Sequence, residues 1–236
     1  MKILVAVEAQ ALAAPTPRAW VALEAGLELR ARGHGDSEVV LASVGGSDAE
    51  RSLRRGLAMG ADRAILAGEQ ALEDAEALTM ARVLAKVAAR EAPTLILCAA
   101  HGTGGVAGIA MAGLLDLPHV AFVDAIDGER LTVERELEGG AVEQLSIATP
   151  ALLSVQRAGH PPRQPTLREI ERARAKPLEV LNLADLGLEL ATLVALAGSR
   201  TIGLGERPRG PAAPLGETPS EIAAQIVRIV QRAVRV

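Results

Sequence analysis

The sequence predicts an α/β fold of three layers, in which a mostly parallel β-sheet is flanked by helices on both faces. In the first half, short runs rich in β-branched residues alternate with helical patterns, as expected of parallel strands joined by crossover helices. The run 94–99 is apolar after its first residue, which is typical of a central strand buried on both faces. Paired strands separated by glycine turns follow residue 124 and predict an antiparallel extension.

Four strand–helix units account for the first half of the chain. The run 2–7 is apolar after its lysine, and three further short runs have the same character. Strands are therefore expected at 2–7, 38–43, 63–67 and 94–99. Helices are expected at 17–32, 49–59, 75–89 and 106–115. Glycines directly follow the first two helices, where helix ends commonly need them. A fifth strand is expected near 119–123.

The second half is organised differently. Strands at 131–137 and 142–149 flank the turn Glu138-Gly139-Gly140, and 150–156 is expected to return as a further strand of the antiparallel extension (124–156). A loop rich in proline and arginine then leads into a basic helix at 167–175. This loop and helix form the segment 157–176. Together these parts are assigned to one α/β domain, 1–187.

A C-terminal arm and helix, 188–236, is expected to follow the domain. Glycine and proline are so dense in 201–216 that regular structure is not expected there. The capping box Thr218-Pro219-Ser220-Glu221 predicts the start of a helix. An apolar stripe runs along it at Ile222, Ile226, Ile229, Val230 and Ala233. Such a stripe must be buried against its own domain or against another chain.

Composition narrows the classes of protein to consider. The chain has 236 residues, of which 49% are hydrophobic and 23% charged, a normal balance for a globular protein. A formal net charge of -4 argues against a nucleic-acid partner. A single cysteine, Cys98, fits a reducing compartment. The first residues lack the features of a signal peptide, and no run is apolar enough for a membrane helix, so a cytoplasmic protein without membrane insertion is expected.

Two glycine-rich turns are the best candidates for a ligand site. Val44-Gly45-Gly46-Ser47 and His101-Gly102-Thr103-Gly104-Gly105 both follow predicted parallel strands and precede helices. Backbone amides and the helix dipole converge at such a turn, which suits a phosphate group. The alternative is that the glycines only permit tight turns. Neither turn matches the lysine-containing ATPase motif or the spaced dinucleotide fingerprint.

Other polar residues carry weaker signals, and no catalytic residue or metal site is predicted. The four histidines lack metal-ligand spacing. Only His101 lies in the candidate site, as a ligand contact or as a solvated side chain. Cys98 ends a buried strand and fits a small core residue. The alternating glutamates at 134–138 indicate a solvated strand face, and the basic residues at 168–176 indicate either a solvated helix face or a docking edge.

Several stretches match a known family in their order and spacing. They lie at 2–7, 57–63, 81–86, 133–140, 150–153, 165–167 and 184–187. The run Leu57-Ala58-Met59-Gly60-Ala61-Asp62-Arg63 is the most characteristic. Together these residues resemble the β subunit of electron-transfer flavoprotein over most of the chain.

The resemblance implies a nucleotide-binding domain of the adenine-nucleotide-hydrolase-like type, which acts as an electron carrier rather than an enzyme. It implies a heterodimer with an α subunit that holds most of the redox FAD, while this chain binds AMP or, in bifurcating members, a second FAD. Electrons would pass from flavin dehydrogenases, such as the acyl-CoA dehydrogenases of fatty acid oxidation, to a quinone reductase or another acceptor.

The resemblance also implies site residues. Nucleotide contacts are implied at the end of the first strand, the entry to the first helix, the turn after the second strand and the loop after the fourth. These are Ala6, Thr16, Pro17, Arg18, Ala19, Val44, Cys98, Ala100, His101, Gly102, Thr103, Gly104, Gly105, Val106 and Ala107. The segment 157–176 corresponds to the family's recognition loop, and Leu167 matches the leucine that anchors the dehydrogenase.

Three features depart from the family pattern. The segment Glu8–Pro15 is short and has no aromatic residue. Thr16-Pro17-Arg18 replaces the usual Asn-Pro-Phe, and the loop 101–105 is shorter than usual and uncharged. Additional glycines expose more amides, so anion binding is expected to persist with altered selectivity.

Two alternatives remain open at the level of sequence. One is a stand-alone nucleotide-binding regulator that resembles universal stress proteins, which share the strand and glycine-turn geometry. The other is a paralogue that keeps the dimer but uses another redox partner, or none. The antiparallel extension, Pro165-Thr166-Leu167 and the C-terminal arm favour the electron carrier over the regulator.

Overall fold

The computed structural model describes residues 1–9, 20–32, 37–73, 75–128, 132–197 and 218–233. The chain divides into two compact units, Met1–Arg200 and Thr201–Val236. The expected arm segment 201–216 lies outside the described residues. Each unit is treated by itself below.

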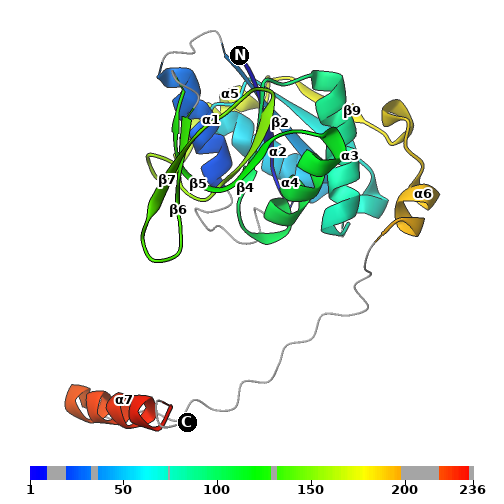
Figure 1. Ribbon diagram of the computed structural model, residues 1–236. Helices are drawn as coiled ribbons and strands as arrows, with labels where there is room; N and C mark the ends of the chain where they lie inside the picture. The colour runs from blue at the N-terminus through cyan, green and yellow to red at the C-terminus, as the bar shows by residue number, and fades with distance from the viewer. Residues whose placement is uncertain (10–19, 33–36, 74, 129–131, 198–217, 234–236) are drawn as a thin grey trace. The chain divides into compact units, whose positions relative to one another are not determined.

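The first unit is built around one mostly parallel sheet (Figure 1). Its strands, within the described residues, are β1 (Lys2–Ala6), β2 (Glu38–Gly45), β3 (Arg63–Gly68), β4 (Leu95–Ala99), β5 (His119–Asp127), β6 (Thr132–Glu136), β7 (Val142–Ser146), β8 (Ala151–Val155) and β9 (Leu178–Leu181). They lie in the order β7-β6-β5-β8-β4-β1-β2-β3-β9. Only the pairs β5–β6 and β6–β7 are antiparallel in the described sheet.

Helices cover both faces of this sheet, which confirms the predicted α/β fold. They are α1 (Val21–Ala31), α2 (Ser47–Met59), η3 (Gln70–Leu72), α3 (Ala77–Glu91), α4 (Gly102–Leu115), α5 (Leu167–Ala173), η4 (Ala184–Leu186) and α6 (Leu190–Ala195). Alternate strand residues point to opposite faces. Ile3 and Val5 pack in the core under α1, α2 and α5, whereas Leu4 packs in the core under α3, α4 and α6. Figure 1 shows α3 and α4 side by side on their face.

Strand β8 corrects one expectation. We expected 150–156 to continue the antiparallel extension, but β8 pairs in parallel with both β4 and β5 and is buried at every residue. The antiparallel part of the sheet is therefore confined to the β5–β6–β7 meander. A short run of mostly apolar residues fits a central strand as well as an extension, and only the sheet order distinguishes the two.

Several elements differ from expectation in extent or existence, among them α4, β9 and α6. Helix α4 begins at Gly102, four residues earlier than predicted from Val106, so the glycines form its first turn. Strand β9 and helix α6 were not predicted, because four and six residues are too short to show a clear period. Leu193 of α6 is buried in the core on the α3 side. The predicted domain end at residue 187 remains a prediction.

The second unit contains helix α7 (Pro219–Ala233). The predicted capping box is present: the Glu221 amide donates to Thr218 Oγ1 (3.3 Å), and the Thr218 amide donates to Glu221 Oε2 (3.2 Å). The apolar residues Ile226, Ile229 and Val230 are about half exposed on the unit.

Candidate functional site

The carboxyl ends of three neighbouring parallel strands define the candidate site. Strand β1 pairs with β2 on one side and with β4 on the other. The chain runs outward from β1 through β2 and β3, then crosses back to place β4 on the opposite side. Loops that leave such a switch point diverge, and open α/β sheets bind their ligands in the crevice between them.

The first turn of α4 supplies a concentration of backbone amides at this point. The N-cap residue of the helix is His101, whose own side chain makes no capping hydrogen bond. Gly102 has a φ of +72°, which favours glycine, and a Cβ atom at Gly105 would collide with the backbone carbonyl of Ala100. The glycines are therefore needed for the close return of the chain after β4. They leave amides of the helix N-terminus open to an anion.

Glu8 lies directly against this turn and brings a carboxyl group to a loop whose own residues, 101–105, are uncharged. It follows β1, and its Oε1 accepts a hydrogen bond from the Gly104 amide. A Cβ atom at Gly102 would lie 3.3 Å from the same oxygen. Burial raises the pKa of the Glu8 carboxyl, while the hydrogen bond from Gly104 acts in the opposite direction. The cradle thus already holds one carboxylate.

An aromatic pair stands beside the same turn. The rings of His101 and Phe122 are 5.7 Å apart and inclined by 56°. Phe122 has a φ of +58°, lies at an irregularity in the β5–β8 pairing and is 47% exposed. An exposed phenylalanine in strained backbone suits a binding surface. The sequence pattern did not predict this pair, because nothing local places Phe122 near residue 101.

Below α4, Cys98, Ser154 and His119 form a short polar row. Ser154 Oγ lies 2.8 Å from His119 Nε2 and 3.3 Å from Cys98 Sγ. Burial raises the pKa of the Cys98 thiol to about 11 and lowers the pKa of His119. The thiol is therefore neutral at physiological pH, and its place is that of a core residue.

The turn after β2 has different surroundings. Val44 is buried, and Gly45 has a φ of +131°. The short helix η3 covers this turn: a Cβ atom at Gly46 would lie 2.7 Å from Gln70 Oε1 and 3.4 Å from Glu73 Oε1. Val44 therefore offers only its backbone, and its proposed ligand contact remains a prediction.

The structure brings part of the predicted set together. Ala6 lies at the end of β1, next to the end of β4, and Ala100–Gly105 form the turn into α4. Further along α4, Val106 is exposed and Ala107 is buried. Residues 16–19 lie outside the described residues.

The segment that contains Leu167 is held firmly to the rest of the unit. Glu24 of α1, almost fully buried, accepts hydrogen bonds from the Arg163 guanidinium (2.6 Å) and backbone amide (3.0 Å). These contacts lower the pKa of Glu24 against the effect of its burial. Glu28 similarly contacts His160 at 2.8 Å. Helix α5 then begins with a capping box between Thr166 and Glu169, which leaves Leu167 72% exposed.

Two kinds of feature are absent from the described residues. In that part of the chain, no helix is long and apolar enough to cross a membrane. Among the same residues, no group of three or more histidine, cysteine or acidic side chains is arranged to hold a metal ion.

Comparisons with known proteins agree with this architecture. Residues 3–186 match the family described as the electron transfer flavoprotein domain. The chain is 34% identical over 216 residues to the electron transfer flavoprotein subunit beta of Methylophilus methylotrophus, covering 88% of this chain and 82% of that protein. It is also 34% identical over 200 residues to the subunit beta of Mus musculus, covering 81% and 76%. The chain therefore belongs to the electron transfer flavoprotein family, as a relative of its beta subunits.

Proposed function

We propose that this chain is the β subunit of a heterodimeric electron carrier and binds AMP, or a second FAD, at the start of α4. An electron-transfer role follows from the family. The observation that carries the nucleotide proposal is the glycine-rich first turn of α4 at the switch point of the sheet. A stand-alone regulator is less well supported, because the similarity to beta subunits covers most of the chain.

The cradle fits a phosphate in shape. The Gly104 amide already donates to a carboxylate oxygen, so its direction suits an oxyanion. Phe122 and His101 would offer a surface for a ring. Glu8 opposes phosphate binding, because its carboxylate and a phosphate on the same cradle repel each other. We infer that a nucleotide phosphate displaces the Glu8 carboxylate or binds when that group is protonated.

We further propose that the α subunit, which would hold most of the redox FAD, covers the exposed face of α4. Val106, Ile109 and Leu114 on this helix are each at least 50% exposed, although their side chains are large and apolar. A helix with such a face is normally covered. Helix α7 carries a second exposed apolar stripe, at Ile226, Ile229 and Val230, which is also suited to a partner chain.

Leu167 is the proposed contact for a flavin dehydrogenase. Its exposed side chain stands on a segment fixed by Glu24 and Glu28, so little ordering is needed on binding. An apolar side chain framed by charged ones is a common form of small hot spot. From the dehydrogenase, electrons would continue to a quinone reductase or another acceptor.

The decisive experiment is to purify the chain together with a candidate α subunit, denature the complex and identify the released nucleotides by absorbance and mass. One flavin and one AMP per complex would support the carrier with a structural nucleotide. Two flavins would support a second FAD in this chain. Purification without a partner or flavin would refute the carrier and favour a regulator.

The docking proposal has its own test. Leu167→Ala should reduce the rate of electron transfer from the dehydrogenase about tenfold, which is the size of effect expected from truncating one hot spot. The unfolding free energy should change by less than about 0.5 kcal/mol, because the side chain is exposed. Leu167→Met keeps an apolar side chain of similar volume and should transfer at nearly the normal rate. Equal rates for Leu167→Ala and the unchanged protein would contradict the proposed role of Leu167 as the dehydrogenase contact.

A further inference from the structure

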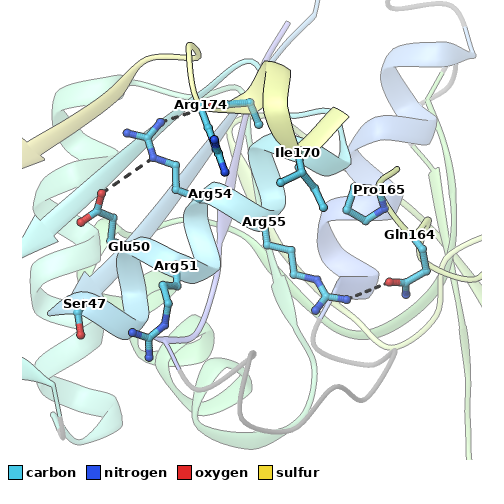
Figure 2. A pocket seen from close by; sticks show the side chains of 11 residues that line it. Ser47, Glu50, Arg51, Arg54, Arg55, Gln164, Pro165, Ile170 and Arg174 are labelled. Carbon is cyan, nitrogen blue, oxygen red and sulfur yellow. Dashed lines mark hydrogen bonds and ion pairs between the residues drawn. The ribbon is translucent and has the colours of Figure 1, made fainter. Parts of the chain in front are cut away.

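A cavity of about 840 Å³ lies away from the candidate nucleotide site, between α2, α5 and the loop before α5. Four residues of α2, at 51, 54, 55 and 58, follow the spacing of one helix face and line it. Figure 2 shows Arg51, Arg54 and Arg55 leaving α2 on this side, with Ile170 and Pro165 across from Arg55. The volume falls within the range of about 300–1,000 Å³ that is usual for small-molecule pockets.

Both walls of this cavity are fixed before any ligand arrives. Arg54 Nη1 donates to the backbone carbonyl of Lys176 (3.1 Å), three residues beyond α5. Lys176 in turn donates to the carbonyl of Leu57 (3.0 Å). Arg55 Nη2 donates to Gln164 Oε1 (3.0 Å) in the preceding loop. A preformed cavity loses less free energy to ordering when a ligand binds.

Positive charge dominates the lining. Arg51, Arg54, Arg55 and Arg174 contribute four guanidinium groups, whereas Glu50 is the one acidic residue among the lining residues. Arg51 also pairs with Asp48, so two carboxylates face four guanidinium groups. Each guanidinium has five N–H donors, more than the described contacts use. An anionic head group would find both charge and donors here.

The remaining lining is apolar. Ala58 and Ala173 are almost fully buried in the floor, and Ile170 and Pro165 form part of one side. A bare inorganic anion would gain nothing from this surface. We propose that the cavity binds a small organic anion with an apolar body, in which a carboxylate, sulfonate or phosphate faces the arginines and the body lies on Ala58, Ile170 and Ala173. This site is separate from the nucleotide cradle and does not depend on it.

The only tryptophan of the chain provides a reporter. Trp20 is buried, and the Arg55 guanidinium lies 5.6 Å from the centre of its ring. The probe 8-anilinonaphthalene-1-sulfonate has an anionic head and an apolar body, and it accepts energy from tryptophan. Titration of the full chain should therefore show saturable loss of Trp20 emission. Decanoate should displace the probe, whereas decanol, which lacks the charge, and sulfate, which lacks the apolar body, should not.

A double variant, Arg51→Ala with Arg174→Ala, removes exposed charge and leaves Arg54 and Arg55 in place. We expect it to bind the probe about tenfold more weakly, which corresponds to loss of charge-assisted contacts. Arg172→Ala, on α5 but outside the cavity lining, is the matched control and should bind normally. Circular dichroism and thermal unfolding check that each variant is folded.

Three results would overturn the proposal. Equal probe affinity in the double variant and the control would show that Arg51 and Arg174 do not contribute to binding. Equal displacement by decanol and decanoate would indicate an apolar surface without anion selectivity. Displacement by an acidic peptide but not by decanoate would mark a protein-docking surface instead.

Discussion

The two glycine-rich turns look alike in sequence but have different surroundings in the structure. Both follow a parallel strand and precede a helix, and β1 lies between their strands. Two side chains cover the turn at Gly45-Gly46: Gln70 of η3 and Glu73, which directly follows η3. The turn at Gly102–Gly105 instead meets the Glu8 carboxylate and the His101–Phe122 pair.

This difference separates two uses of glycine. In the first turn, glycine permits a positive φ at Gly45 and close approach of the η3 side chains. In the second, it permits the chain to return against Ala100 while backbone amides remain available to an anion. A glycine cluster is therefore a candidate phosphate site only when its amides are open or already donate to an anionic oxygen. Five predictions sharpen or break this comparison.

The largest effect on stability is expected for Gly105→Ala. Its Cβ would collide with the carbonyl of Ala100, a backbone atom that cannot move aside without shifting the start of α4. We expect a loss of about 2 kcal/mol in unfolding free energy, measured by urea denaturation. Gly113→Ala is the control on the same helix, because its added Cβ would have no atom within 4 Å apart from the helix backbone and the adjoining residues. It should be neutral or stabilising by about 0.5–1 kcal/mol. Equal stability of the two variants would contradict the close packing.

The next prediction concerns the nucleotide. Gly104→Asp should lower the nucleotide content or affinity of the purified protein at least about tenfold, because it adds bulk and a second negative charge against Glu8. Mass spectrometry of the denatured protein measures the content. Gly104→Ala adds only bulk and should give a smaller loss. Unchanged content in Gly104→Asp would place the nucleotide elsewhere.

Glu8→Gln removes the competing charge and should act in the opposite direction. We expect AMP to bind about fivefold more tightly at neutral pH, as measured by calorimetry, which corresponds to about 1 kcal/mol of relieved repulsion. Weaker binding in this variant would show that Glu8 assists the nucleotide.

The Glu8→Gln variant also tests how the unfolding free energy depends on pH. Because the pKa of Glu8 is raised in the folded protein, the folded state holds this proton more tightly than the unfolded chain does. Glu8 therefore contributes stability at pH below its ordinary pKa, and that contribution is lost as the pH rises through the raised value. Denaturation across this interval should show a flatter pH dependence for Glu8→Gln than for the unchanged protein. Parallel curves would contradict the raised pKa.

The smallest effect is expected for Gly46→Ala. Its Cβ would meet the end of the flexible Gln70 side chain, which can move aside. The unfolding free energy should fall by no more than about 1 kcal/mol, and the nucleotide content should stay unchanged. If this variant lost its nucleotide as Gly104→Asp is expected to, the distinction between the two turns would fail.

The sequence by itself determined the class of fold and most of its elements. The alternation of apolar runs and helical patterns predicted β1–β4 and α2–α3 within a few residues, since local periodicity reflects which faces are buried. The capping box at Thr218 was an equally local signal, and the order and spacing of the matching stretches indicated the correct family.

Only the tertiary structure decided which distant residues meet. Glu8 lies 96 positions from Gly104, and Phe122 reaches His101 through a strained backbone at the β5 irregularity. The central place of β8 and the arginine-lined cavity between α2 and α5 likewise depend on sheet order and helix packing. These contacts join segments that are far apart in the chain. A local pattern records how each segment is buried, but it does not record which segment buries it.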